Sequence, residues 1–174
     1  MPRKIDGLIE KINTETKKQL KENGYSAITV CSIAKGAGVG TGTVYANFKN
    51  KEDLVFQCMN EEWEKCHAEN EAYAKEYQSI EAIEKIYGCI LRFCKENERL
   101  FKDPTAKKAL GSSMNEYHFK LIEKIISLIN PMLENNSFSD KKLAAMVVAE
   151  MMLKFIGSRN DFSEVSEFFE KMLK

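Results

Sequence analysis

The chain has 174 residues, of which 44% are hydrophobic and 30% are charged, and its formal net charge at pH 7 is zero. This composition is ordinary for a globular protein, and the length suits one domain or a small domain joined to a medium one. Apolar runs fall short of the roughly 20 residues that a membrane-spanning helix needs, and charged residues interrupt the start of the chain, where a signal peptide has its apolar core. We therefore expect a cytoplasmic protein without a membrane partner.

The charges are unevenly divided along the chain. Residues 1–51 hold nine Lys or Arg against four Asp or Glu, whereas residues 52–174 hold seventeen against twenty-two. A basic region followed by an acidic one is typical of a protein that binds a polyanion through one end, with chance placement as the alternative. The five cysteines form an odd set without a Cys-x-x-Cys pair, so we expect reduced thiols and no metal or cofactor.

The first helix is predicted to end at Asn23, because apolar side chains recur at helical spacing up to this point and Asn23-Gly24 is a usual helix stop. We expect this helix to brace the segment that follows. Its apolar stripe comprises Ile5, Leu8, Ile9, Ile12, Thr16 and Leu20.

Residues 24–54 predict two short helices joined by a glycine turn. Ile33 lies on the inner face of the first helix, and Val39 and Val44 supply apolar groups from the turn and the second helix. The small side chain of Ala34 suits a close helix crossing, and Gly38 suits the left-handed backbone that ends the first helix. This arrangement is a helix-turn-helix, which points to DNA.

Short polar residues mark the ends of these helices. Thr29 is predicted to cap the first, and Asn50 with Asp53 forms a capping pair for the helix that follows. Gly40 takes the cap position before the second helix, at a small cost in stability. Glycines before a helix can also bind a phosphate, but neither a preceding strand nor a Gly-Lys-Ser/Thr ending is present, so a nucleotide site is disfavoured.

An ordered series of residues runs through this segment: Gly24-Tyr25, Thr29-Val30, Ile33-Ala34, Ala37-Gly38-Val39, Gly42-Thr43-Val44-Tyr45, Phe48 and Lys51. The series resembles the N-terminal domain of TetR-family transcriptional regulators, and the match extends over residues 5 to 55. The resemblance implies an all-α protein. It also implies an N-terminal three-helix helix-turn-helix domain in residues 1–50 and a helical ligand-sensing and dimerisation domain in residues 51–174.

The rest of the chain carries apolar residues at helical spacing without sustained strand-like alternation, which also predicts an all-α fold. Pro104 and Pro131 are expected to separate successive helices, because proline breaks a helix interior. The predicted helices run from Lys51 into the sixties or early seventies, over 80–97 with a short successor, from near Ser112 to Pro131, and over about 140–158 and 162–174.

A recognition helix in the major groove presents the exposed residues of its N-terminal part to the bases. The resemblance implies that Thr43, Tyr45 and Lys51 touch backbone phosphates. Thr41 and Asn47 are better suited to bases, because a threonine methyl can touch thymine and an asparagine amide can pair with adenine in two places. The predicted DNA-binding residues are Thr29, Thr41, Gly42, Thr43, Tyr45, Asn47 and Lys51.

The last two helices are rich in Met and Phe, which favours a dimer interface over core packing within one chain. The residues concerned are Val147, Met151, Phe155, Phe162, Val165 and Phe169. The resemblance implies that the central helices bind a small-molecule effector. The candidate effector residues, with core packing as the alternative, are Trp63, Tyr87, Cys94, Phe101, Met114, Tyr117, His118, Met152 and Phe155.

These observations predict a sequence-specific transcriptional regulator that binds a double-stranded DNA operator as a homodimer. By resemblance, it is a repressor that a small molecule releases from DNA. A thiol-responsive regulator is the alternative, with Cys89 and Cys94 or Cys58 and Cys66 as redox partners. An enzyme is disfavoured, because the Cys and His residues show no recognisable spacing for a nucleophile, a base and an orienting group.

Overall fold

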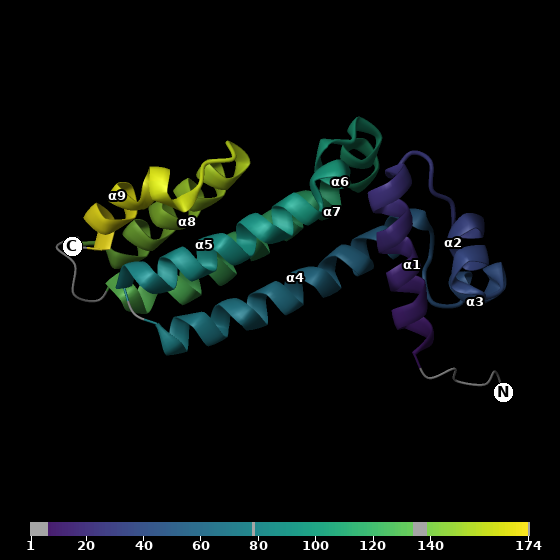
Figure 1. The fold of residues 1–174 in the computed structure, drawn as a ribbon, viewed down its shortest axis with the longest axis horizontal. Coiled ribbons are helices and arrows are strands. Elements are labelled where there is room, and N and C mark those ends of the chain that lie inside the picture. Colours follow the sequence, from purple (N-terminus) through teal and green to yellow (C-terminus); the bar gives the residue numbers. More distant parts are fainter. Residues whose placement is uncertain (1–6, 78, 134–138, 174) are drawn as a thin grey trace. The chain divides into compact units, whose positions relative to one another are not determined.

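The computed structural model describes residues 7–77, 79–133 and 139–173, apart from the side chains of residues 112 and 114–117. Regular structure in this part is entirely helical, which confirms the all-α prediction (Figure 1). No helix among the described residues combines the length and apolar character needed to cross a membrane. The elements are α1 (Leu8–Asn23), α2 (Val30–Ala37), α3 (Thr41–Tyr45), α4 (Lys51–Glu76), α5 (Ser79–Glu96), α6 (Glu98–Lys102), α7 (Pro104–Ile129), the 3-10 helix η1 (Asn130–Leu133), α8 (Lys141–Gly157) and α9 (Phe162–Leu173).

The chain forms two compact units. The first comprises Met1–Glu62 with Glu96–Met114, and the second comprises Trp63–Lys95 with Asn115–Lys174. The predicted domain boundary after residue 50 falls at the start of α4 and stays a prediction.

In the first unit, α1 packs against α2, and α2 packs against α3. The core of this unit includes Ile12, Tyr25, Ile28, Ile33, Val44, Phe48 and Leu54, all of which are buried. Ile9 was predicted on the buried stripe of α1, but its side chain is 43% exposed. The buried face of α1 begins one turn later, at Ile12, so the first turn of the helix remains open to solvent.

The helix predicted to start near Ser112 begins earlier, at Pro104. Proline is well tolerated at a first helical position, because the missing amide has no partner there in any case. The Asp103 carboxylate accepts hydrogen bonds from the next two amides of the helix, at 2.8 and 3.1 Å, and so caps it. Pro131 lies in η1, after the α-helix has ended, as predicted.

In the second unit, α8 packs against α9, and an aromatic cluster joins α5, α8 and α9. The ring of Phe169 lies 6.1 Å from that of Tyr87 and 6.0 Å from that of Phe155. Val165 and Phe169 are buried within the single chain. Their predicted place in a dimer interface is therefore corrected: α9 turns both side chains toward the core of its own unit.

Candidate DNA-binding site

The start of α2 is fixed by a reciprocal pair of hydrogen bonds. The Thr29 Oγ1 accepts from the Ser32 amide at 3.0 Å, and the Ser32 Oγ accepts from the Thr29 amide at 3.1 Å. The Ser32 hydroxyl also donates to the Gln19 Oε1 at 2.7 Å, and the Gln19 amide donates to the Ser32 carbonyl at 3.0 Å. The predicted cap at Thr29 is confirmed, and the same residues connect α2 to the bracing helix α1.

The turn after α2 depends on Gly38, which has φ 69° and ψ 31° in the left-handed region. Its amide donates to the Lys35 carbonyl at 3.2 Å, and the Val39 amide donates to the Ala34 carbonyl at 2.9 Å. These two bonds form a Schellman motif, which satisfies the last carbonyls of the helix. Gly40 follows as the cap of α3, in extended conformation and without a side-chain hydrogen bond, as predicted.

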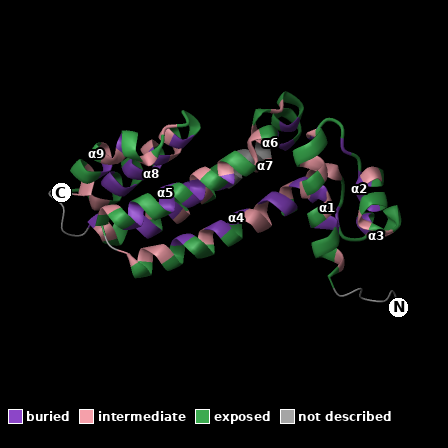
Figure 2. Ribbon diagram, viewed as in Figure 1, coloured by how far each residue is buried: buried purple, intermediate pink, exposed green. Residues whose placement is uncertain are grey.

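The helix α3 presents one buried residue and a mostly exposed outer face, as Figure 2 shows. Val44 is fully buried and anchors the helix, whereas the side chain of Tyr45 is 58% exposed. Thr43 is half-buried, and the Asn47 side-chain amide donates to its carbonyl at 2.8 Å. The other exposed positions of the helix are Thr41 and Gly42.

Lys51, at the start of α4, has its ammonium group held by the first unit itself. The Nζ donates to the Tyr25 carbonyl at 3.0 Å and to the Ile28 carbonyl at 3.2 Å, and it lies 4.0 Å from the centre of the Tyr25 ring. The Tyr25 hydroxyl donates to the Glu52 Oε1 at 2.8 Å. Burial and this bond raise the pKa of Tyr25, and the same bond lowers the pKa of Glu52.

Asn50 and Asp53 cap α4. The Asn50 Oδ1 accepts from the Asp53 amide at 2.8 Å, as predicted, while the Asp53 carboxylate accepts from the Lys49 amide at 2.8 Å. The carboxylate also accepts from the Gln57 side chain, and this bond is the largest cause of the lowered pKa of Asp53. These bonds fix the path of the chain from α3 into α4.

The capped helix α2, the turn at Gly38 and the exposed helix α3 thus form a helix-turn-helix. This element is typical of DNA-binding proteins. Residues 12–58 match the family model of the bacterial regulatory proteins of the tetR family. Residues 12–58 are therefore similar to the DNA-binding domain of tetR-family regulatory proteins, and they contain the helix-turn-helix described above.

Curated relatives agree with this assignment. The chain is 28% identical over 149 residues to an uncharacterized HTH-type transcriptional regulator, YhgD, of Bacillus subtilis, covering 80% of this chain and 77% of the relative. It is also 50% identical over 42 residues to the fatty acid metabolism regulator protein of the same organism. That second match covers 24% of this chain and 22% of the relative.

Solved structures extend the likeness to the whole fold. The fatty acid degradation regulator FadR from Bacillus halodurans superposes with a TM-score of 0.67 at 19% identity, covering 95% of this chain and 93% of that one. FadR from Bacillus subtilis in complex with stearoyl-CoA gives a TM-score of 0.58 at 20% identity, covering 94% and 96%. The protein therefore has the all-helical fold of TetR-family regulators.

Four of the candidate effector residues lie in the helices of the second unit and pack in different places. Tyr87 and Phe155 belong to the aromatic cluster around Phe169, and the Tyr87 hydroxyl donates to a backbone carbonyl at 2.7 Å. Trp63 packs elsewhere, edge-on against the Phe93 ring at 5.4 Å. Met152 is fully buried.

The other candidate effector residues are more scattered. Phe101 is part of the first unit, and His118 is exposed. Cys94 is half-buried, and burial raises the pKa of its thiol to about 11. The side chains of Met114 and Tyr117 lie outside the described residues. A shared effector site for these residues stays a prediction.

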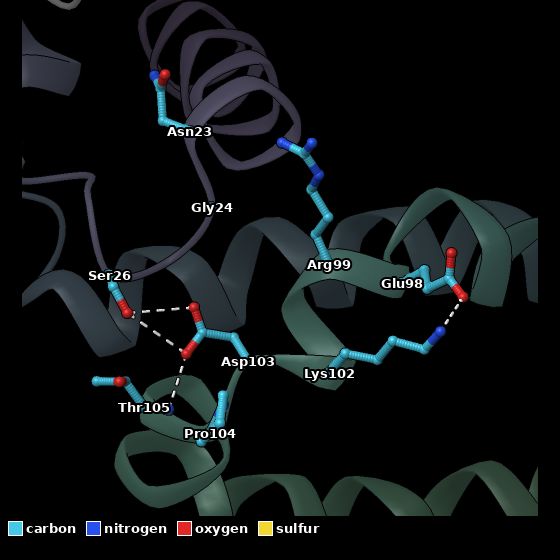
Figure 3. Close-up of a pocket in the computed structure, with 9 residues that line it drawn as sticks. All are labelled: Asn23, Gly24, Ser26, Glu98, Arg99, Lys102, Asp103, Pro104 and Thr105. Carbon is cyan, nitrogen blue, oxygen red and sulfur yellow. Dashed lines mark hydrogen bonds and ion pairs between the residues drawn. The ribbon is translucent and has the colours of Figure 1, made fainter.

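A hollow of about 470 Å³ lies in the first unit, where α1 ends and α6 and α7 meet (Figure 3). The predicted effector residues do not line it. Its charged side chains have partners within the chain: Arg99 donates to the carbonyls of Lys21 and Glu22 at 2.8 and 2.9 Å, and Lys102 pairs with Glu98 at 2.6 Å. The contact of Arg99, which caps α1 across 77 residues of sequence, leaves no local pattern from which it could be predicted. The lining residues are Asn23, Gly24, Ser26, Glu98, Arg99, Lys102, Asp103, Pro104 and Thr105.

The structure contradicts one of the two predicted redox pairs, Cys58 with Cys66. Cys58 and Cys66 are two turns apart on α4, about 12 Å along the helix axis, so they cannot meet. The structure instead places the Sγ of Cys66 2.9 Å from the Sγ of Cys89 on α5. Within the described part of the chain, no cluster of three or more His, Cys, Asp or Glu suits a metal ion.

Proposed function

We propose that this transcriptional regulator is a repressor that binds its operator as a homodimer, with α3 in the major groove. The exposure of α3 carries the proposal, because Val44 anchors the helix while Tyr45 stands free of the core. The basic character of residues 1–51 supports it as well, since phosphate contacts supply much of the affinity for DNA.

The contacts within the free chain refine the proposed roles. Thr43 and Tyr45 touch phosphates through their hydroxyls, and Thr41 reaches a base. Asn47 must release the Thr43 carbonyl before its amide can pair with adenine in two places. Lys51 uses two of the three donors of its ammonium group within the chain, which leaves one for a phosphate.

The experiment that tests this proposal is selection of duplexes from a random library, followed by affinity measurements by fluorescence anisotropy. We expect the affinity to fall by about 10³ or more between about 50 and 200 mM salt if six phosphates are contacted. Tyr45→Ala should weaken binding at least tenfold. Phe119→Ala, which removes an aromatic ring with 68% exposure from the other compact unit, should leave it unchanged. Failure to enrich any sequence, or equal effects of the two variants, would refute the proposal.

The dimer is proposed to form through α8. Its buried face packs within the chain, but a second apolar stripe on the same helix remains exposed. Leu143, Met146 and Val147 are 51, 44 and 38% exposed, which is costly for large apolar side chains unless a partner covers them. A second copy of the same stripe is the natural partner in a two-fold dimer.

The proposed effector is an acyl-CoA thioester. Relatives named as fatty acid regulators support it, among them the structure solved in complex with stearoyl-CoA. The buried Trp63, Tyr87 and Met152 of the second unit would provide apolar contacts for the acyl chain. To release the operator tenfold, the effector must favour the DNA-free conformation by about 1.4 kcal/mol.

The effector proposal is tested by titrating stearoyl-CoA into the complex of the protein with a selected duplex. We expect release of the DNA by stearoyl-CoA and no release by free coenzyme A. Unchanged DNA affinity in stearoyl-CoA would refute this effector while leaving the DNA-binding result intact. Release by stearate alone would assign recognition to the acyl chain without the nucleotide.

A further inference from the structure

Cys66 and Cys89 form a thiol pair inside the second unit. Cys66 lies on α4 and Cys89 on α5, their Sγ atoms are 2.9 Å apart, and both side chains are buried, with 6 and 2% exposure. A disulfide bond is about 2.05 Å long, so the two sulfur atoms need to approach by only about 0.9 Å to be joined. The helices already hold the two cysteines in position for a cross-link.

Neighbouring side chains keep this pair in place. The Asn70 amide, one turn further along α4, lies 3.7 Å from the Sγ of Cys66. Arg92, one turn beyond Cys89 on α5, forms an ion pair with Glu69 of α4. Side chains from both helices therefore lie against the two sulfur atoms.

The surroundings also distinguish the two thiols. The Arg92 guanidinium lies 3.4 Å from the Sγ of Cys89, where a positive charge stabilises a thiolate, and the Glu69 carboxylate at 3.5 Å opposes it. The hydrogen bond between the sulfurs lowers the pKa of Cys89, and together with burial it raises the pKa of Cys66. Because the Arg92 guanidinium lies beside Cys89, Cys89 is the better nucleophile of the pair.

We propose that Cys66 and Cys89 are a redox modification site, at which a peroxide converts the thiol pair into an intramolecular disulfide between α4 and α5. The Cys89 thiolate attacks one oxygen of hydrogen peroxide, which forms Cys89 sulfenic acid and releases water once the leaving hydroxide is protonated. The Cys66 sulfur then displaces the hydroxyl of the sulfenic acid as a second water, with loss of the Cys66 proton. Two thiols are oxidised by two electrons, and one peroxide is reduced to two waters.

The modification goes beyond the proposed repressor function and does not depend on it. It would fix α4 against α5 within the second unit, where the effector is proposed to bind. The exposed ion pair of Arg92 and Glu69 lies against Cys89, and its movement would admit the oxidant to the sulfur.

Mass spectrometry of the native protein after treatment with hydrogen peroxide tests the proposal directly. Trypsin releases Cys66 in the peptide 66–75, Cys89 in 86–92 and the exposed Cys31 in 22–35. We expect 66–75 joined to 86–92, at two hydrogen masses below their sum, and separation of the two on reduction. The proposal would be overturned if peptides 66–75 and 86–92 remained separate and could be alkylated under conditions that oxidise Cys31. A cross-link that forms only when the protein is unfolded in urea would overturn it as well.

Variants test the assigned order of events. In Cys66→Ser, a sulfenic acid at Cys89 should be trapped by dimedone, whereas Cys89→Ser should give no adduct at Cys66. Arg92→Ala should slow disulfide formation several-fold, while Lys95→Ala removes a positive charge from the same helix and should not. Equal rates in the Arg92 and Lys95 variants would overturn the role of the guanidinium, and an adduct at Cys66 alone would reverse the assignment of the nucleophile.

Discussion

Gly38 carries the turn of the helix-turn-helix, and its substitution has a cost that can be worked out from the structure. Its φ of 69° lies where only glycine is free of strain, and a Cβ built there meets no atom within 4 Å. The cost of a side chain at this position is therefore conformational and not steric. An ordinary residue in the left-handed region costs roughly 1–2 kcal/mol, asparagine less and a β-branched residue more.

We expect the loss in free energy of unfolding to be smallest for Gly38→Asn, larger for Gly38→Ala and largest for Gly38→Val. The loss should be about 1 kcal/mol for alanine and about 2 kcal/mol or more for valine. At a urea m-value of about 2 kcal/mol/M, the alanine variant should unfold about 0.5 M earlier. Urea titrations followed by helical circular dichroism measure this shift.

Gly42 offers a matched control. A Cβ built there also meets nothing within 4 Å, but Gly42 lies inside α3 without a positive φ. Gly42→Ala should leave stability unchanged or raise it by up to about 1 kcal/mol, because alanine favours a helix. If valine at position 38 were as stable as the wild type, or if the alanine variants at 38 and 42 lost equal stability, the account of the turn would be refuted.

Two caps and one tyrosine give further predictions. Thr29→Ala should cost about 1 kcal/mol by urea denaturation, because it leaves an amide of α2 without its partner, whereas an unchanged midpoint would contradict the capping role. Gly40→Ser should gain a few tenths of a kcal/mol, because α3 lacks a side-chain cap, and a loss of stability would argue against it. Burial raises the pKa of Tyr87 to about 12, so the folded chain keeps a proton that the unfolded chain loses near pH 10. Stability should be intact below about pH 10 and fall toward pH 12, and Tyr87→Phe should make that fall shallower, as urea midpoints across this range would show.

Local chemistry made the helix-turn-helix predictable from sequence. Thr29, Gly38 and Gly40 act through bonds and backbone angles within a few residues, and each was found where the sequence placed it. The presence of the later helices was likewise predicted from apolar residues at helical spacing. The prediction for the start of α7 is wrong, because a proline that separates two helices equally suits the first position of the second one.

Contacts between distant segments were beyond the sequence. The cap that Arg99 provides for α1 and the carbonyls that hold the Lys51 ammonium depend on how helices pack, which no local pattern encodes. Pairing Cys66 with Cys89 likewise requires the register of α4 against α5. The sequence could list cysteines at helical spacing, but it could not say which of them face each other.

The burial of Phe169 shows the same limit for the dimer prediction. An apolar stripe looks alike whether it faces its own chain or a partner, and the structure alone assigns this residue to the core. Of the exposed stripe on α8, Val147 was among the residues predicted for the dimer interface, whereas Leu143 and Met146 were not.

The measurement that tests the central claim most directly is a hydroxyl-radical footprint of the protein on a selected duplex, with Tyr45→Ala alongside. A two-fold dimer that reads DNA through α3 predicts two protected half-sites whose centres lie one helical turn, about 34–36 Å, or slightly more apart. Both should disappear together in the variant at the same protein concentration. A single protected site, or two sites that persist unchanged in Tyr45→Ala, would contradict recognition of DNA through this helix.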